Sequence, residues 1–132
     1  MASRFTELVV DSHDPRAQAE FWCEVLGYRI VDEDKDAQVI EIGTEQLVAD
    51  EVVRGPVPPT IVFLPVPEDK TVKNRLHIDL SPIDRDPPEE VERLIALGAH
   101  PVDIGQGDVG WTVLADPEGN EFCVLRRLQS SS

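Results

Sequence analysis

The sequence has few basic residues, few aromatic residues and only two cysteines. Lysine and arginine together number 12 against 26 aspartates and glutamates, which gives a formal net charge of −14. A chain this acidic repels phosphate backbones and anionic lipid headgroups, so we expect neither nucleic-acid nor membrane partners. No run of apolar residues approaches the roughly 20 that a membrane-spanning helix needs.

The two cysteines, Cys23 and Cys123, belong to no CxxC pair. They are typical of reduced thiols rather than of a disulfide framework. The first residues of the chain also lack the basic start and apolar run of a secretory signal. We therefore expect a cytoplasmic protein.

The length of 132 residues suits one domain with a hydrophobic core of its own. Apolar residues make up 41% of the chain, and they fall in periodic clusters rather than being scattered. This patterning excludes wholesale disorder.

The first half of the chain predicts one helix among several strands. Asp14 can cap a helix that begins with Pro15, and Gly27 suits its C-terminal end. Ala17 and Phe21 belong to its apolar face. Strands are expected at residues 5–10, 28–31, 38–42 and 60–64.

The second half repeats this order. A strand is expected at 76–80, and then a helix that Asp86 caps, with prolines at its start, Glu89 as a capping-box acid and Gly98 at its end. Further strands are expected at 100–104, 111–115 and 121–125, with a tight turn at 116–120 between the last two. His77 follows Glu7 by 70 positions, so a strand–helix–strand–strand–strand unit occurs twice. Two such half-sheets side by side would form a curved surface with a cleft, a common place for ligands.

These features resemble the vicinal-oxygen-chelate superfamily, which includes glyoxalase I, bleomycin-resistance proteins and extradiol dioxygenases. Four pieces carry the resemblance: Asp14-Pro15 with Phe21-Trp22, the helix end at 26–28, His77 within its strand, and the Asp-Pro-Glu-Gly-Asn turn at 116–120. The segment 66–77 is similar in particular to a glyoxalase-like subgroup. The implied fold is α+β, with two tandem βαβββ modules forming a curved mixed sheet around a cleft. The expected single domain spans 4–127, with modules at 4–66 and 74–127 and a disordered tail at 128–132.

The resemblance also implies where a metal would bind. Enzymes of the superfamily place four metal ligands on the first and last strand of each module, and the corresponding positions here are Glu7, about Leu64, His77 and Cys123. Leu64 cannot coordinate an ion, and Cys123 stands where a glutamate is usual. Glu7, His77 and Cys123 could still form a mixed site for zinc, nickel, manganese or iron, which the thiolate would bias toward softer ions. In the alternative interpretation Cys123 is a small buried residue, Glu7 and His77 form a hydrogen-bonded pair, and no metal is resident, which is what we expect.

Three further residues have two interpretations each. Glu121 shares a strand face with Cys123 and is either a general base or a solvated acid at a strand end. Asp79 shares the face of His77 and either orients the imidazole or is a surface acid. Trp111 either lines a ligand pocket or closes a core.

The sequence thus predicts a protein that binds a small organic molecule in its cleft without a complete catalytic metal site. One alternative is a metal-dependent lyase, isomerase or dioxygenase that uses Glu7, His77 and Cys123. Another is a metal-free enzyme with His77 and Glu121 or Asp79 as acid and base. The predicted ligand-binding positions are Glu7, Val9, Leu64, His77, Asp79, Trp111 and Cys123.

Two further expectations concern the oligomeric state and the basic residues of the chain. Superfamily members often dimerise and open sheets have edges that a second subunit can cover, so we expect a homodimer. The basic residues Arg54, Lys70, Lys73 and Arg75 either attract an anionic ligand or lie in a solvated loop, and the loop is what we expect.

Overall fold

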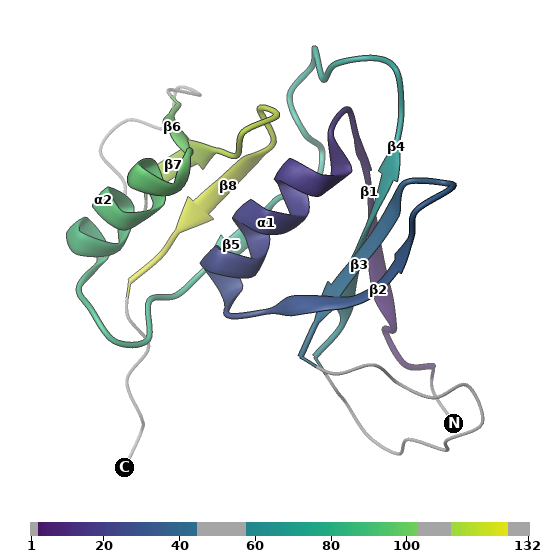
Figure 1. Ribbon diagram of the computed structural model, residues 1–132. Helices are drawn as coiled ribbons and strands as arrows, with labels where there is room; N and C mark the ends of the chain where they lie inside the picture. Colours follow the sequence, from purple (N-terminus) through teal and green to yellow (C-terminus); the bar gives the residue numbers. More distant parts are fainter. Residues whose placement is uncertain (1–2, 45–57, 103–111, 127–132) are drawn as a thin grey trace. The chain divides into compact units, whose positions relative to one another are not determined.

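The computed structural model describes residues 3–44, 58–102 and 112–126. The chain divides into two compact units, Met1–Asp69 and Lys70–Ser132. Each unit contains one helix and one four-stranded sheet (Figure 1). Trp111 and the tail at 128–132, for which predictions were made, lie outside the described residues.

The first unit contains β1 (Glu7–Ser12), α1 (Pro15–Leu26), β2 (Arg29–Asp34), β3 (Val39–Gly43) and β4 (Thr60–Pro65). Its sheet has the order β1-β4-β3-β2. The β1–β4 pair is parallel, whereas β4–β3 and β3–β2 are antiparallel. Helix α1 packs on β3 and β4, so one face of this sheet is covered within the unit.

The second unit contains β5 (Ile78–Leu80), α2 (Pro87–Leu97), β6 (His100–Pro101), β7 (Thr112–Ala115) and β8 (Glu121–Val124). Its sheet has the order β5-β8-β7-β6, with a parallel β5–β8 pair and two antiparallel pairs. Both units therefore share one topology, and the prediction of an α+β fold built from two βαβββ modules is confirmed. Strand β5 begins at Ile78, so His77 immediately precedes the strand that was expected to contain it.

The ends of α1 follow from its sequence. The Asp14 carboxylate accepts a hydrogen bond from the Ala17 N–H at 3.2 Å, and Pro15 occupies the first turn, where no N–H is needed. Gly27 ends the helix in the left-handed conformation, with φ of 68°, and its N–H bonds to the Cys23 carbonyl. Both predicted ends of this helix are confirmed.

Helix α2 begins where expected, but the predicted capping box is wrong. Asp86 is the N-cap residue, yet its side chain makes no capping hydrogen bond. Pro87 and Pro88 follow it, and a proline at the second helical position removes one of the two N–H groups that an N-cap side chain normally accepts from. Glu89 and Glu90 still place negative charge in the first turn, which suits the helix dipole.

Burial in the second unit fixes the position of β8. Phe122 and Val124 are each 1% exposed, and α2 packs against β8. Burying a side chain of this size contributes roughly 2 kcal/mol, more than the roughly 1 kcal/mol of a typical hydrogen bond. The core therefore holds the strand in register, and polar residues on the other face of β8 are placed by it.

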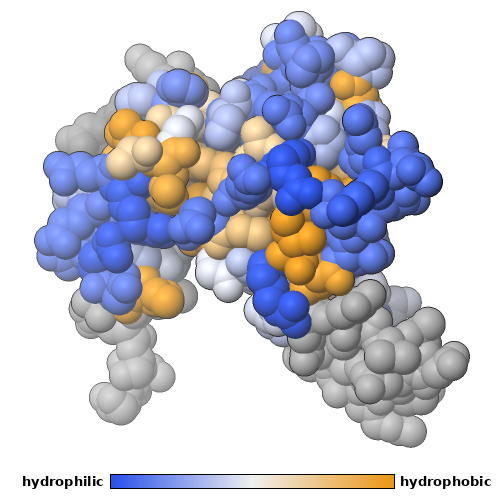
Figure 2. All heavy atoms as spheres, in the orientation of Figure 1, coloured by the Kyte–Doolittle hydropathy of each residue, from blue (hydrophilic) through white to orange (hydrophobic). Residues whose placement is uncertain are grey.

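The surface is mostly hydrophilic on the face shown in Figure 2. Neither helix of the described part of the chain is long and apolar enough to cross a membrane. Among the residues that the structure describes, the large apolar side chains that are exposed are Phe5, Val9, Val72, Leu76, Ile83 and Ile95.

Candidate functional site

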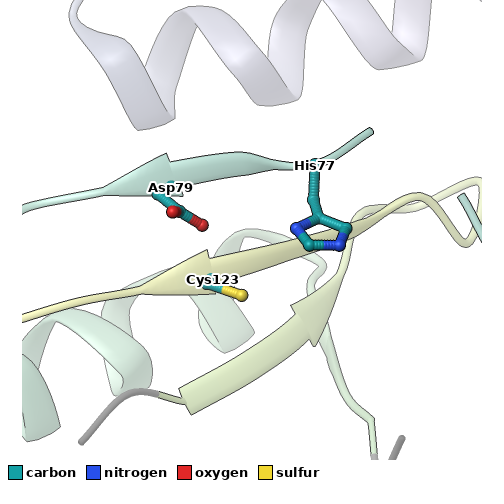
Figure 3. Close-up of side chains that lie close together, drawn as sticks. All are labelled: His77, Asp79 and Cys123. Atoms are coloured by element: carbon teal, nitrogen blue, oxygen red, sulfur yellow. The ribbon is translucent and has the colours of Figure 1, made fainter. Parts of the chain in front are cut away.

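The candidate site lies on the β5–β8 pair of the second unit. The parallel register places Asp79 beside Cys123, with Ile78 beside Phe122. His77 precedes Asp79 by two residues, and the alternation of side chains along extended chain gives both the same face. Figure 3 shows the three side chains of His77, Asp79 and Cys123 gathered on that face.

The three side chains offer one nitrogen, one oxygen and one sulfur donor. One donor atom from each of His77, Asp79 and Cys123 lies within 4.8 Å of the others. His77 and Asp79 are exposed, whereas Cys123 is only 6% exposed. The cluster therefore has a buried sulfur at its base and two groups that are accessible from solvent.

The electrostatics of the cluster keep the thiol protonated. Burial raises the pKa of Cys123, and the negative charge of Asp79 together with the hydrogen bond to its carboxylate raises that pKa further. The positive charge of Lys73 acts in the opposite direction without reversing the shift. A reactive cysteine needs a lowered pKa, so the metal-free site is not arranged for thiolate nucleophilic catalysis.

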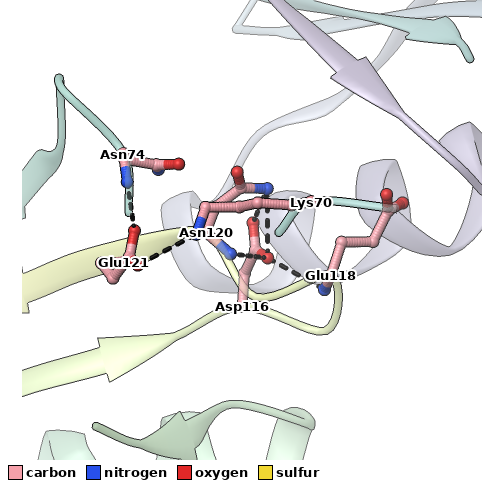
Figure 4. A network of polar contacts seen from close by, with 6 residues as sticks. All are labelled: Lys70, Asn74, Asp116, Glu118, Asn120 and Glu121. Atoms are coloured by element: carbon pink, nitrogen blue, oxygen red, sulfur yellow. Dashed lines mark hydrogen bonds and ion pairs between the residues drawn. The ribbon is translucent and has the colours of Figure 1, made fainter. Parts of the chain in front are cut away.

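Glu121 lies two residues before Cys123 and forms a second polar network (Figure 4). Its carboxylate accepts a hydrogen bond from Lys70 Nζ at 2.9 Å and another from the Asn74 N–H at 2.9 Å. Burial raises the pKa of Glu121, but these two hydrogen bonds, a hydrogen bond from its own backbone and the positive charge of Lys70 together outweigh burial, and the pKa is lowered overall. The side chain is therefore held as a carboxylate that ties residues 70–74 to β8.

Two sequence interpretations are corrected by this network. Glu121 is not a solvated acid, because its side chain is only 10% exposed and is ion-paired. Lys70 does not extend into solvent from a loop either, because its side chain is 19% exposed and bonds to Glu121. Since Asn74 lies three residues before His77, the network anchors the segment that leads to the cluster.

The turn between β7 and β8 positions the start of β8. Asp116 is 1% exposed, and its carboxylate accepts hydrogen bonds from the N–H groups of Glu118 and Asn120 at 3.0 and 2.9 Å. The Asn120 side-chain amide adds a bond at 3.1 Å (Figure 4). Gly119 adopts φ of 91°, a conformation that side chains rarely permit. This turn is a structural element whose polar groups bond to one another.

Apart from Trp111, which lies outside the described residues, the remaining predicted site residues belong to the first unit. Glu7 and Val9 are exposed on β1, and Leu64 is half-buried on β4, where it pairs in register with Asp11. Within the second unit, the structure brings together His77, Asp79 and Cys123. Their roles in ligand or metal binding remain predictions.

Sequence reasoning underrated one member of the cluster and missed two of its neighbours. Asp79 was expected to orient His77 or to be a surface acid, and to contact a ligand, but it was not expected to lie beside Cys123, because the sequence does not show which β8 residue is its neighbour. The two-residue spacing from His77 was the available signal, because it places Asp79 on the same face of the strand. The β5–β8 register then makes Asp79 a neighbour of Cys123. Lys70 and Asn74 gave no comparable signal, since their partner Glu121 is 51 and 47 residues away.

The donor set is chemically suited to a divalent transition ion. Imidazole, carboxylate and thiolate are the three ligand types that zinc accepts, and catalytic zinc sites commonly have three protein ligands and an open position. The thiolate disfavours magnesium and calcium, which prefer oxygen ligands. The residues present therefore fit a zinc-like ion.

Comparison with known proteins gave one family match and many structural matches. The family described as the glyoxalase-like domain matches residues 7–125. No curated protein matches the sequence.

Several solved structures share the fold at low sequence identity. A fosfomycin resistance protein, FosX, from Listeria monocytogenes, complexed with Mn(II) and a dihydroxypropylphosphonic acid, has a TM-score of 0.66 at 14% identity. That match covers 97% of this chain and 93% of FosX. The trypanothione-dependent glyoxalase I of Leishmania major has a TM-score of 0.62 at 14% identity. That match covers 95% of this chain and 87% of the glyoxalase chain. A glyoxalase/bleomycin resistance protein/dioxygenase family enzyme from Burkholderia phytofirmans has a TM-score of 0.60 at 18% identity, with 92% and 97% covered.

Proposed function

The chain belongs to the glyoxalase-like domain family, and from this premise we propose that it binds a small organic molecule on the sheet face that carries His77, Asp79 and Cys123. The observation that carries the proposal is the grouping of these three side chains, with two of them exposed above a buried thiol. Polar groups that converge on one place of a sheet can orient a bound ligand.

The polar groups would each have a distinct role toward such a ligand. The His77 imidazole can donate or accept a hydrogen bond, and the Asp79 carboxylate accepts. The Cys123 thiol is engaged with Asp79, so it lines the base of the site rather than reacting. The proposed ligand therefore carries at least one hydroxyl or similar donor for Asp79.

The proposal does not require the four-ligand metal set that the resemblance implies. Leu64 offers no donor atom, and Glu7 belongs to the first unit. Binding of an organic molecule through His77 and Asp79 needs neither of them as a metal ligand. The ligand-binding roles predicted for Glu7, Val9 and Leu64 in the first unit remain predictions.

A second candidate function is a metal-dependent lyase, isomerase or dioxygenase. The observation that favours it is that the structure supplies a third donor, Asp79, beside His77 and Cys123. A divalent ion held by these residues would polarise an oxygen of the substrate. The chain's own contribution would be to hold the ion and leave an open position for that oxygen.

The remaining expectations stand as parts of the proposal. We propose a cytoplasmic homodimer that binds neither nucleic acid nor membranes. The two free cysteines support a reducing compartment, and the net charge of −14 supports the exclusion of anionic polymers. Within their own units, β1 and β5 are edge strands, which a second subunit could cover.

The test uses NMR signals of the histidine rings in the full-length protein. A panel of small diols, hydroxy acids and phenols is added, and the ring resonances of His77 are followed with those of His100 as a matched control. His100 is also exposed, but it lies on β6 at the opposite edge of the same sheet. The proposal expects at least one compound to shift His77 alone, with the effect lost in Asp79→Ala. If no compound shifts His77, or if every hit shifts His100 equally, the proposal is wrong.

A further inference from the structure

We propose that the ligand of the second unit is an organic anion that also carries a hydroxyl group, with Lys73 and Arg75 binding its carboxylate and Asp79 accepting a hydrogen bond from its hydroxyl. This inference rests on the proposed function and names the chemical class of the ligand. The sequence alone favoured a solvated loop for the basic residues of this segment. Arg54, which was grouped with them, lies outside the described residues.

The segment at 70–77, which precedes β5, is basic in an otherwise acidic chain. Lys70, Lys73 and Arg75 are three of the 12 lysines and arginines, and the segment contains no aspartate or glutamate. The net charge of the chain is −14. Most of the surface therefore repels an anion, and a local group of positive charges is where an anionic ligand would be drawn.

The segment is fastened to β8 at two points. Lys70 Nζ and the Asn74 N–H both donate to the Glu121 carboxylate, each at 2.9 Å (Figure 4). Glu121 lies two residues before Cys123 on the same strand. Because the two anchors flank Lys73 in the sequence, the backbone of Lys73 is held beside the strand that carries Cys123.

Two of the three basic side chains keep their charge available. Lys70 is paired with the carboxylate on β8, and its side chain is 19% exposed. Lys73 and Arg75 are exposed, and neither side chain forms a hydrogen bond or ion pair with any residue that the structure describes. The charge of Lys73 also reaches the cluster, because it acts to lower the pKa of the Cys123 thiol against the larger effect of burial.

The arrangement of charges selects a ligand with two kinds of polar group. Lys73 and Arg75 precede His77 in the sequence and Asp79 follows it, and all four are exposed. Two positive charges and one negative charge leave one positive charge, which a monocarboxylate balances. The carboxylate accepts from the two cations, and the hydroxyl donates to Asp79. A simple anion would meet the repulsion of Asp79 without using its acceptor oxygens.

The experiment compares matched pairs of compounds in the full-length protein. Glycolate, lactate, 3-hydroxybutyrate and salicylate are each titrated beside the corresponding amide, which keeps the hydroxyl and lacks the charge. The ring resonances of His77 report binding. We expect at least one acid to bind about threefold to thirtyfold more tightly than its amide, as two exposed ion pairs would give. This difference should shrink as the ionic strength rises.

The outcomes separate this inference from the proposed function. If amides bind as tightly as their acids, or bind where the acids do not, ligand binding at His77 stands and the anionic class is wrong. A preference for the acid that does not change with ionic strength would also overturn the inference. If no compound of either kind shifts the His77 resonances, the proposed function fails and the inference fails with it.

Variants assign the preference to the two cations. Lys73→Ala and Arg75→Ala should each weaken binding of the acid about twofold to fivefold and leave binding of the amide unchanged. Lys73→Arg keeps the charge and should keep the preference. Lys35→Ala is the matched control, because it removes an exposed lysine from the first unit, and it should change neither affinity. Equal weakening of acid and amide in Lys73→Ala and Arg75→Ala, or an equal loss of acid binding in Lys35→Ala, would overturn the assignment.

Discussion

Asp79 and Cys123 are register partners in the parallel β5–β8 pair, and the carboxylate of one accepts a hydrogen bond from the thiol of the other. This pairing joins the edge strand of the second unit to the strand at its core. It also links an exposed acid to a buried sulfur. The chemical behaviour of either group consequently depends on the other.

The first prediction is that Asp79→Asn lowers the pKa of the Cys123 thiol. Burial, the main cause of the raised pKa, remains in the variant, but the negative charge of Asp79 is removed. More thiolate should therefore be present at any given alkaline pH. The measurement is the ultraviolet absorbance of the thiolate against pH, in metal-free protein with Cys23→Ser so that only Cys123 reports.

A control variant for this titration is Asp32→Asn, which removes an exposed acid from β2 of the first unit. It should leave the thiol titration unchanged. A thiol pKa that stays constant or rises in Asp79→Asn would show that the carboxylate does not act on the sulfur.

The second prediction concerns the pH dependence of stability through Glu121. Its folded-state pKa lies below the ordinary value of 4.5, so its stabilisation is present above that value and is lost as the pH falls through the lowered pKa. Glu121→Gln should therefore reduce the free energy of unfolding at neutral pH by about 1–2 kcal/mol, as expected for charged hydrogen bonds with partial exposure. The difference from the wild type should narrow in acid. Urea unfolding at a series of pH values measures the difference in the free energy of unfolding between the two proteins. A difference that stays constant across the series would refute the lowered pKa of Glu121.

The third prediction is that Glu121 acts on His77 through the segment at 70–74. If the cluster holds a divalent ion, as the metal-dependent candidate requires, Glu121→Ala should weaken the binding of cobalt(II), a spectroscopic substitute for zinc, because Asn74 and Lys70 lose their common partner. Glu121→Gln should restore part of the affinity, since its amide oxygen can still accept from Asn74. Glu90→Ala is the matched control, because Glu90 has the same side-chain exposure of 10% and an ion pair of its own with Arg93. Equal weakening in both alanine variants would indicate general destabilisation instead.

The fourth prediction is that Asp116→Ala strongly destabilises the protein. The carboxylate is buried and accepts from Glu118 and from the backbone and side chain of Asn120, so its removal leaves several donors without their acceptor. We expect a loss of about 2–4 kcal/mol in the free energy of unfolding. Chemical denaturation measures the loss, and Glu92→Ala on the exposed side of α2 should change it by less than about 0.5 kcal/mol. If Asp116→Ala lowers the free energy of unfolding by an equally small amount, the turn does not stabilise the fold as proposed.

Local signals allowed most of the fold to be predicted from the sequence. Asp14, Pro15 and Gly27 each act within one turn of α1, and the helix begins and ends where they indicate. The predicted capping box failed at Asp86, because Pro88 at the second helical position removes one of the N–H groups that the Asp86 side chain would accept from. Strand ends were less exact, because β1 extends as far as its parallel pairing with β4 allows.

The candidate site was only partly predictable, because it depends on which strands are neighbours. Alternation placed Asp79 on the face of His77 and Glu121 on the face of Cys123. The sequence does not show that Asp79 lies beside Cys123, which follows from the β5–β8 register. The contact of Lys70 with Glu121 joins residues 51 positions apart, and no motif marks it.

The most direct test of the central claim is diffraction from crystals of the full-length protein soaked with a compound that shifts the His77 ring resonances. The account predicts electron density for the organic molecule within hydrogen-bond distance of a ring nitrogen of His77 and a carboxylate oxygen of Asp79. Crystals grown with zinc separate the metal-dependent candidate, which expects an anomalous peak at the zinc edge about 2.0–2.3 Å from donor atoms of His77, Asp79 and Cys123. A map in which the compound is absent from this cluster, or is bound only elsewhere, would contradict the account.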